Sequence, residues 1–124
     1  MTEGYRRPTP ITCPHSTQPH SRRAMIVVSG TITLGPDNVD DALAAIAELV
    51  PPTLAEEGCI SYGFWHSPTE PGCFRVFEEW ENQAALDGHF AAPHMAAFLG
   101  AMGGFGVTGT EIWRYDGAEK SRLM

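Results

Sequence analysis

The spacing of apolar residues changes several times along the chain, and each change marks an expected element. Strict alternation over 25–34 predicts a β-strand. Residues 39–50 instead repeat at i, i+3, i+4 and i+7, which predicts an amphipathic helix. Pro51 and Pro52 follow directly and lack backbone N–H donors. We therefore expect them to kink or split this helix.

The remainder of the chain predicts a hairpin, a broken helical region and a last strand. "CISYGFWH" (59–66) and "CFRVFEEW" (73–80) are typical strands, joined by a loop rich in Pro and Gly. Residues 83–90 and 93–102 predict two helical pieces, and 107–115 a final strand. The order β-α-β-β-α-β predicts an α+β, ferredoxin-like fold, with helices on one face of an antiparallel sheet.

Large side chains fall on both faces of the expected hairpin. Tyr62 and Phe64 alternate with Trp65 on the first strand, and Val76 alternates with Phe77 on the second. A sheet with two apolar faces needs cover on the face without helices. A symmetric homodimer, sheet against sheet, is the expected cover.

Composition divides the chain into an extension, one domain and a short tail. Residues 1–24 are rich in Pro, Ser, Thr and Arg without apolar periodicity, which predicts a disordered extension. The predicted domain covers 25–116, and 117–124 form a C-terminal tail. The sequence shows neither a membrane-spanning apolar run nor a secretory signal, so we expect a cytoplasmic protein.

Charge and cysteine usage limit the partners. Residues 25–124 carry four basic and 14 acidic side chains, a net charge of −10, which disfavours nucleic acid and anionic membranes. A small molecule or a second copy of the chain is the expected partner. The three cysteines form no CxxC pair, which predicts free thiols in a reducing compartment.

The histidines of "ALDGHFAAPHMAAF" (85–98) are the leading candidates for chemistry. On one helix, His89 and His94 would lie ~140° apart at ~100° per residue, so we expect no shared metal site. His89 shares its apolar side with Leu86 and is expected to face the sheet and a buried Glu78. Such a pair could be a satisfied core contact or catalytic, and spacing alone favours the core contact. His94 is expected to be an ordinary helix-start residue.

Aromatic side chains are the candidates for a pocket wall. Trp65, Trp80 and Tyr62 carry polar tips that need partners, which suits a binding pocket, and Phe90 follows His89. "GFGVTG" (104–109) spells a dinucleotide-binding motif, but a helix precedes it and a strand follows. That order is the reverse of what the motif requires.

"EEGC" (56–59), "EEW" (78–80) and "ALDGHFAAPHMAAF" together resemble the antibiotic biosynthesis monooxygenase (ABM) family. The stretch "LVPPTLAEEGCISY" (49–62) is most similar to the small bacterial quinol monooxygenases. The resemblance extends from Met25 to about Tyr115. It implies a ferredoxin-like subunit that forms a dimeric α+β barrel.

The resemblance also implies a chemistry. Enzymes of this family oxidise quinols or phenols with O₂ and without metal, flavin or haem, so no cofactor is expected. By this resemblance His89 would be the base or hydrogen-bond partner, Glu78 its orienting carboxylate, and Trp80 part of the wall.

Two other functions stay open at this point. A related haem-degrading monooxygenase would use a helix histidine as iron ligand, but such enzymes also use an Asn in the first strand, and 25–34 contains none. A non-catalytic dimeric barrel that binds a small hydrophobic ligand would need His89 only as a structural residue.

Overall fold

The elements of the computed structural model, which describes residues 24–124, follow the predicted order. They are β1 (Met25–Thr33), a 3-10 turn η4 (Pro36–Asn38), α1 (Val39–Leu54), β2 (Cys59–His66), β3 (Cys73–Trp80), α2 (Gln83–Phe90), α3 (Pro93–Met102) and β4 (Gly109–Ala118). Both hairpin strands have the predicted bounds, whereas β4 begins and ends a few residues later than expected. The disordered extension predicted over 1–24 lies, apart from Ala24, outside the described residues.

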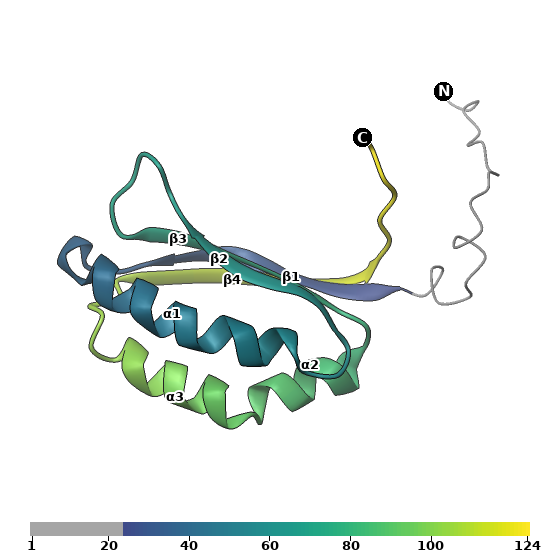
Figure 1. Ribbon diagram of the computed structural model, residues 1–124. Helices are drawn as coiled ribbons and strands as arrows, with labels where there is room; N and C mark the ends of the chain where they lie inside the picture. The colour runs from purple at the N-terminus through teal and green to yellow at the C-terminus, as the bar shows by residue number, and fades with distance from the viewer. Residues whose placement is uncertain (1–23) are drawn as a thin grey trace.

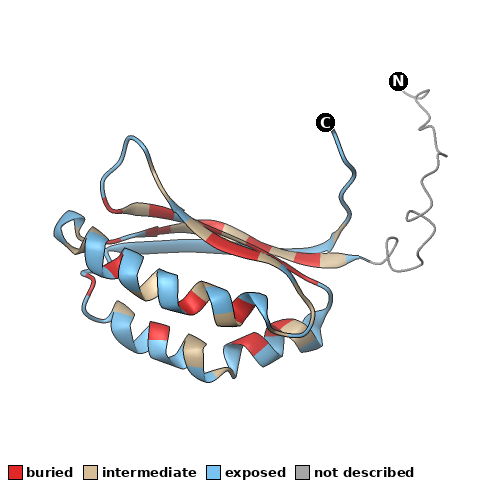
Figure 2. Ribbon diagram, in the orientation of Figure 1, coloured by how far each residue is buried: buried red, intermediate tan, exposed pale blue. Residues whose placement is uncertain are grey.

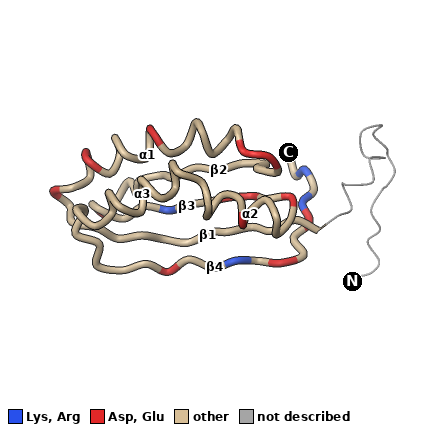
Figure 3. Tube along the Cα trace, turned by 90° about the horizontal axis from the view of Figure 1, so that it is seen from below, with Lys and Arg blue, Asp and Glu red and all other residues tan. Residues whose placement is uncertain are grey.

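The four strands form one antiparallel sheet in the order β2-β3-β1-β4. All three α-helices lie on one face of this sheet (Figure 1), which confirms the ferredoxin-like fold. The helices leave β4 uncovered at one edge (Figure 3). Within the described part of the chain, no helix combines the length and apolarity needed to cross a membrane.

Helix α1 runs through both prolines, so the expected split was wrong. Pro51 and Pro52 fall in its last turn, where only two hydrogen bonds are lost before the helix ends at Leu54. The buried Thr53 also donates its hydroxyl to the carbonyl of Leu49, at 2.8 Å, which satisfies this hydroxyl inside the core. The chain then turns through Gly58 at φ 84° and enters β2.

The two faces of the sheet differ in burial, so buried residues alternate with less buried ones along the central strands (Figure 2). The helix-covered face carries the core, with Val28, Phe74 and Trp80 at 7%, 1% and 0% exposure. The open face presents aromatic side chains instead: Trp65 and Trp113 are 58% and 59% exposed. This second apolar face agrees with the sequence pattern, and the homodimer expected to cover it stays a prediction.

Candidate functional site

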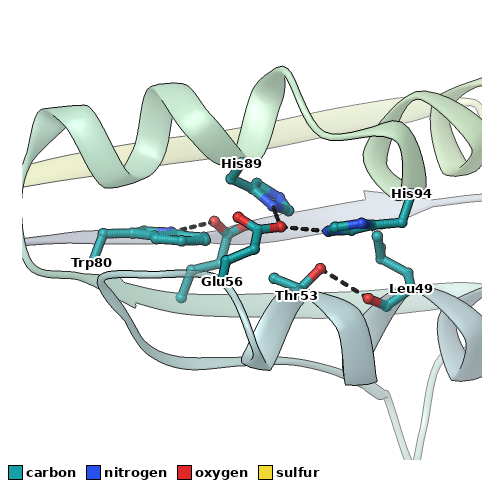
Figure 4. A network of polar contacts seen from close by, with 7 residues as sticks. Leu49, Thr53, Glu56, Trp80, His89 and His94 are labelled. Carbon is teal, nitrogen blue, oxygen red and sulfur yellow. Dashed lines mark hydrogen bonds and ion pairs between the residues drawn. The ribbon is translucent and has the colours of Figure 1, made fainter.

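Glu56, His89 and His94 converge at one end of the helix layer (Figure 4). Nδ1 of His89 lies 3.0 Å from Oε2 of Glu56, and Nε2 of His94 contacts the same oxygen. A carboxylate only accepts hydrogen bonds, so both imidazoles donate N–H to it. Three residues from the α1–β2 turn, α2 and α3 therefore form one polar cluster.

The prediction that the two histidines point apart was wrong. The ~140° separation holds only for residues on one continuous helix. Here the helix is interrupted at Ala91–Ala92. Ala92 is extended, with ψ 145°, and Pro93 then starts a new helical axis. The break brings the two imidazole centroids to 6.3 Å, so His94 belongs to the cluster and is not an ordinary helix-start residue.

The predicted contact between His89 and Glu78 was also wrong. Glu78 does lie on the helix-covered face, but its Oε1 accepts a hydrogen bond of 2.8 Å from Nε1 of Trp80, two residues along the same strand. Burial raises the pKa of Glu78 to about 7. The Trp80 hydrogen bond opposes this rise in the pKa, and the negative charge of Glu56 adds to it.

Aromatic rings enclose the His89 imidazole. Trp80 lies against it with centroids 4.9 Å apart and planes at 34°, and Tyr62 approaches edge-on at 5.0 Å. His89 is fully buried, and its Nε2 atom has no hydrogen-bond partner among residues 24–124. Burial, with the charges of Glu78 and Glu56, raises the pKa of Tyr62, so this phenol stays protonated. His89 thus uses Nδ1 to contact Glu56 and keeps Nε2 without a partner among the described residues, in an apolar surrounding.

The other two predicted pocket residues are largely exposed. Trp65 points to the open face, opposite His89, where its ring covers Gly63 so closely that a Cβ there would approach it to 2.6 Å. Phe90 ends α2 and is 58% exposed, although its ring centroid lies 5.6 Å from that of His89. Of the predicted wall residues, the structure therefore brings Tyr62 and Trp80 to His89.

Two hollows are candidates for a ligand: a groove that Glu56 lines, and an apolar cavity whose lining contains no residue of the polar cluster. An apolar cavity of about 10 Å³ lies between α1, α3 and the sheet, lined by residues including Phe64, Phe98 and Met102. An open groove of about 450 Å³ runs between the α1–β2 turn and α2, and Glu56 forms part of its wall. Its other lining residues are acidic, small or amide: Glu57, Gly58, Glu81, Asn82, Ala84, Ala85, Gly88 and Ala92.

Sequence reasoning missed the role of Glu56. This residue lies in a turn, so no helical or strand period fixes its direction. The available signal was its position two residues before Gly58, because a glycine that ends a helix commonly reverses the chain. That reversal turns the Glu56 carboxylate toward α2 and α3.

Comparison with known proteins gives consistent results. The chain is 42% identical over 74 residues to an uncharacterized protein of Synechocystis sp.. This match covers 60% of the present chain and half of the relative's length. It is 34% identical over 70 residues to the "Probable quinol monooxygenase YgiN" of Escherichia coli, covering 50% of this chain and 67% of that one.

Comparison of the fold with solved structures gives the same relationship. The crystal structure of a conserved protein from Methanosarcina mazei superposes with a TM-score of 0.70 at 29% identity, covering 82% of this chain and 97% of the other. The profile of the antibiotic biosynthesis monooxygenase family matches residues 25–101, which include all three residues of the polar cluster. The chain belongs to the antibiotic biosynthesis monooxygenase (ABM) family.

Proposed function

We propose that this protein is a cofactor-independent monooxygenase that oxidises a quinol or another phenolic aromatic with O₂. One observation carries the proposal: the carboxylate of Glu56 holds Nδ1–H of His89, while Nε2 of the same ring is buried and has no partner among the described residues. A carboxylate that fixes the tautomer in this way makes the opposite nitrogen a proton acceptor. Glu56 therefore takes the orienting role first expected of Glu78.

The protein's task in such a reaction is to take a proton. A phenol placed against Nε2 of His89 passes its hydroxyl proton to the ring, and Glu56 stabilises the resulting imidazolium. Glu78, whose pKa is about 7, is a second acid–base group near neutral pH. Tyr62 and Trp80 exclude water, so the substrate anion is not stabilised by bulk solvent.

The substrate then supplies all the electrons. Its anion gives one electron to O₂, and the superoxide and ring radical combine to form a C–O bond. Cleavage of the O–O bond leaves one oxygen atom on the ring, and the other leaves as water. A quinol QH₂ plus O₂ thus gives a hydroxyquinone and H₂O.

A substrate ring must displace side chains to reach His89. The apolar cavity holds about 10 Å³, whereas ligand pockets are commonly ~300 Å³ or larger. Met102 and Phe98 line this cavity, and the unbranched Met102 side chain adapts readily. We place the ring between this cavity and His89, because Phe64 lines the cavity and Tyr62 contacts both Phe64 and His89. The subunits would form a cytoplasmic homodimer that pairs open sheet faces.

The small cavity is also the observation that favours a second function. If the aromatic layer does not open, the cluster is a structural core contact and the protein is a non-catalytic barrel. A haem group would need far more space than an aromatic ring, which places the haem-degrading function last. A haem titration that gives no Soret shift would exclude it.

The deciding experiment is oxygen uptake with a panel of reduced naphthoquinols and phenols, in the presence of a metal chelator to suppress metal-catalysed autoxidation. We expect acceleration by the protein, and a loss of about 10²- to 10⁴-fold in His89→Ala, the usual contribution of a general base. His66→Ala is the matched control. Its imidazole lies on the same sheet face, packs on Phe74 and accepts a hydrogen bond from Gly72 N, away from the cluster.

Activity equal to the buffer blank across the panel contradicts the proposal. Full turnover in a destabilised His89→Ala protein assigns the histidine a structural role instead. Thermal unfolding of each variant separates these outcomes.

A further inference from the structure

The two histidines and Glu56 together match a ligand set that the proposed reaction does not use. Their three donor atoms, His89 Nδ1, His94 Nε2 and Glu56 Oε2, lie within 4.8 Å of one another. They come from three separate segments, which approach one point from different directions (Figure 4). We propose that Glu56, His89 and His94 form a binding site for a divalent transition-metal ion of the Zn²⁺ class.

The distances suit such an ion with small side-chain movements. Zn²⁺ binds imidazole nitrogen and carboxylate oxygen at ~2.0–2.2 Å, so two ligand atoms of one tetrahedral ion lie ~3.3–3.5 Å apart. His89 Nδ1 and Glu56 Oε2 are now 3.0 Å apart, and an ion between them needs only a slight separation. The His94 side chain is 22% exposed and has room to withdraw from the carboxylate.

The donor set selects the kind of metal. Two imidazoles with one carboxylate suit Zn²⁺, Co²⁺, Ni²⁺ or Cu²⁺, whereas Mg²⁺ and Ca²⁺ prefer all-oxygen sites. Three protein ligands leave a fourth position for water or another small ligand. Oε1 of Glu56 is buried without a hydrogen-bond partner in the described chain, so the carboxylate can also bind through both oxygens.

The surroundings favour a cation. Glu56 borders the open groove, and Glu57 and Glu81 also line it. No Lys or Arg is among the described residues that line this groove. The acidic walls, in a body of net charge −10, raise the local concentration of cations at Glu56.

Metal binding and the proposed base exclude each other. A metal ion on Nδ1 requires the His89 proton to move to Nε2, which then can no longer accept a proton from a substrate. An ion here would therefore inhibit quinol oxidation. This consequence rests on the proposed function, but the existence of the site does not.

The test is a titration of the full chain with Co²⁺, followed through its visible d–d absorption, and with Zn²⁺ by calorimetry. Cys13, His15 and His20 lie outside the described residues and carry metal-binding side chains, so C13S/H15A/H20A is the common background. We expect one equivalent of metal and visible bands typical of four or five ligands. This readout is independent of catalytic turnover, so it tests the metal site separately from the proposed reaction.

Two variants each remove one proposed metal ligand, and a third variant is the matched control. Glu56→Gln and His94→Ala should weaken binding by more than the ~10- to 100-fold that loss of an outer partner costs. Glu57→Gln removes the same charge from the neighbouring, exposed position in the same groove and should weaken binding only slightly, through the weaker field alone. Absence of stoichiometric binding, or equal affinity in all four proteins, overturns the proposal.

Discussion

Glu78 and Glu79 are neighbours on β3, yet they lie on opposite faces of the sheet in different environments. Each is 7% exposed. Glu78 sits in the apolar layer beneath the helices with an indole N–H as its hydrogen-bond partner. Glu79, on the open face, accepts from the Ser61 hydroxyl at 2.7 Å and from the Lys120 ammonium at 3.2 Å. The two residues are equally buried, but the helix-covered face favours a neutral Glu78, whereas the open face pairs Glu79 with a cation.

The difference follows from what covers each face. The helix layer removes water from Glu78 without supplying a cation, and this desolvation raises its pKa. On the open face, the C-terminal tail after β4 brings Lys120 over Glu79. The helix-covered face is thus the one suited to proton chemistry, and the open face is suited to contact with another surface.

The largest expected contrast is between two tryptophans. Trp80→Ala should lower the free energy of unfolding by about 3 to 5 kcal/mol, because this fully buried ring leaves a cavity against His89. Trp113→Ala on the open face should change the stability of the monomer by no more than about 0.5 kcal/mol. Denaturant unfolding at low protein concentration measures both.

Raising the protein concentration then tests the predicted dimer. If open faces pair, the wild-type unfolding midpoint rises with concentration and that of Trp113→Ala rises less. Sedimentation equilibrium of the two proteins gives the same comparison directly. A wild-type chain that stays monomeric at high concentration contradicts the dimer.

The next effect depends on pH. The pKa of Glu78 is about 7 in the folded chain against an ordinary value of 4.5, so the folded state holds a proton that the unfolded state has released. Stability from this group is fully present below pH 4.5 and is lost as pH rises through 7. Glu78→Gln should therefore raise the free energy of unfolding by about 3 kcal/mol above pH 7 and leave it unchanged below pH 4.5.

Denaturant unfolding at pH 4 and at pH 8 gives this difference. The amide oxygen of Gln can still accept the Trp80 N–H, which makes the variant a close match in shape. A stabilisation of the same size at both pH values would mean that packing, not ionisation, separates the two side chains.

The smallest effect belongs to the open face. Glu79→Gln removes the charge that pairs with Lys120, whose side chain is 62% exposed and well screened by solvent. We expect a loss of about 1 kcal/mol or less, which added salt reduces further. Thermal unfolding at low and high ionic strength measures it. A larger, salt-independent loss would indicate that the Ser61 hydrogen bond dominates.

The fold was predictable because its signals are periodic and local. Alternating residues gave 59–66 and 73–80 with the bounds that the structure has, and the element order gave the topology. The site was only partly predictable. His89, Tyr62 and Trp80 were found because they lie on regular elements whose inward face follows from the period.

The remaining site residues could not be predicted, because their positions depend on turns and interhelix angles that the spacing of apolar residues does not determine. Glu56 lies in a turn, and the approach of His94 to His89 depends on the angle between two short helices. The prediction for Glu78 placed it on the correct face but with the wrong partner, because the indole of Trp80 lies closer along the same strand. Trp65 has the same aromatic character as Trp80, and its place in the alternation put it on the other face.

The two-residue break at Ala91–Ala92 has a consequence for how this sequence can evolve. An insertion or deletion there would change the distance and angle between α2 and α3 and move His94 away from Glu56. The loop from Ser67 to Gly72, between β2 and β3, carries no residue of the cluster, so a change in its length would leave the cluster in place. Related chains that keep the polar cluster should therefore vary in the hairpin loop and preserve the number, rather than the identity, of residues between α2 and α3.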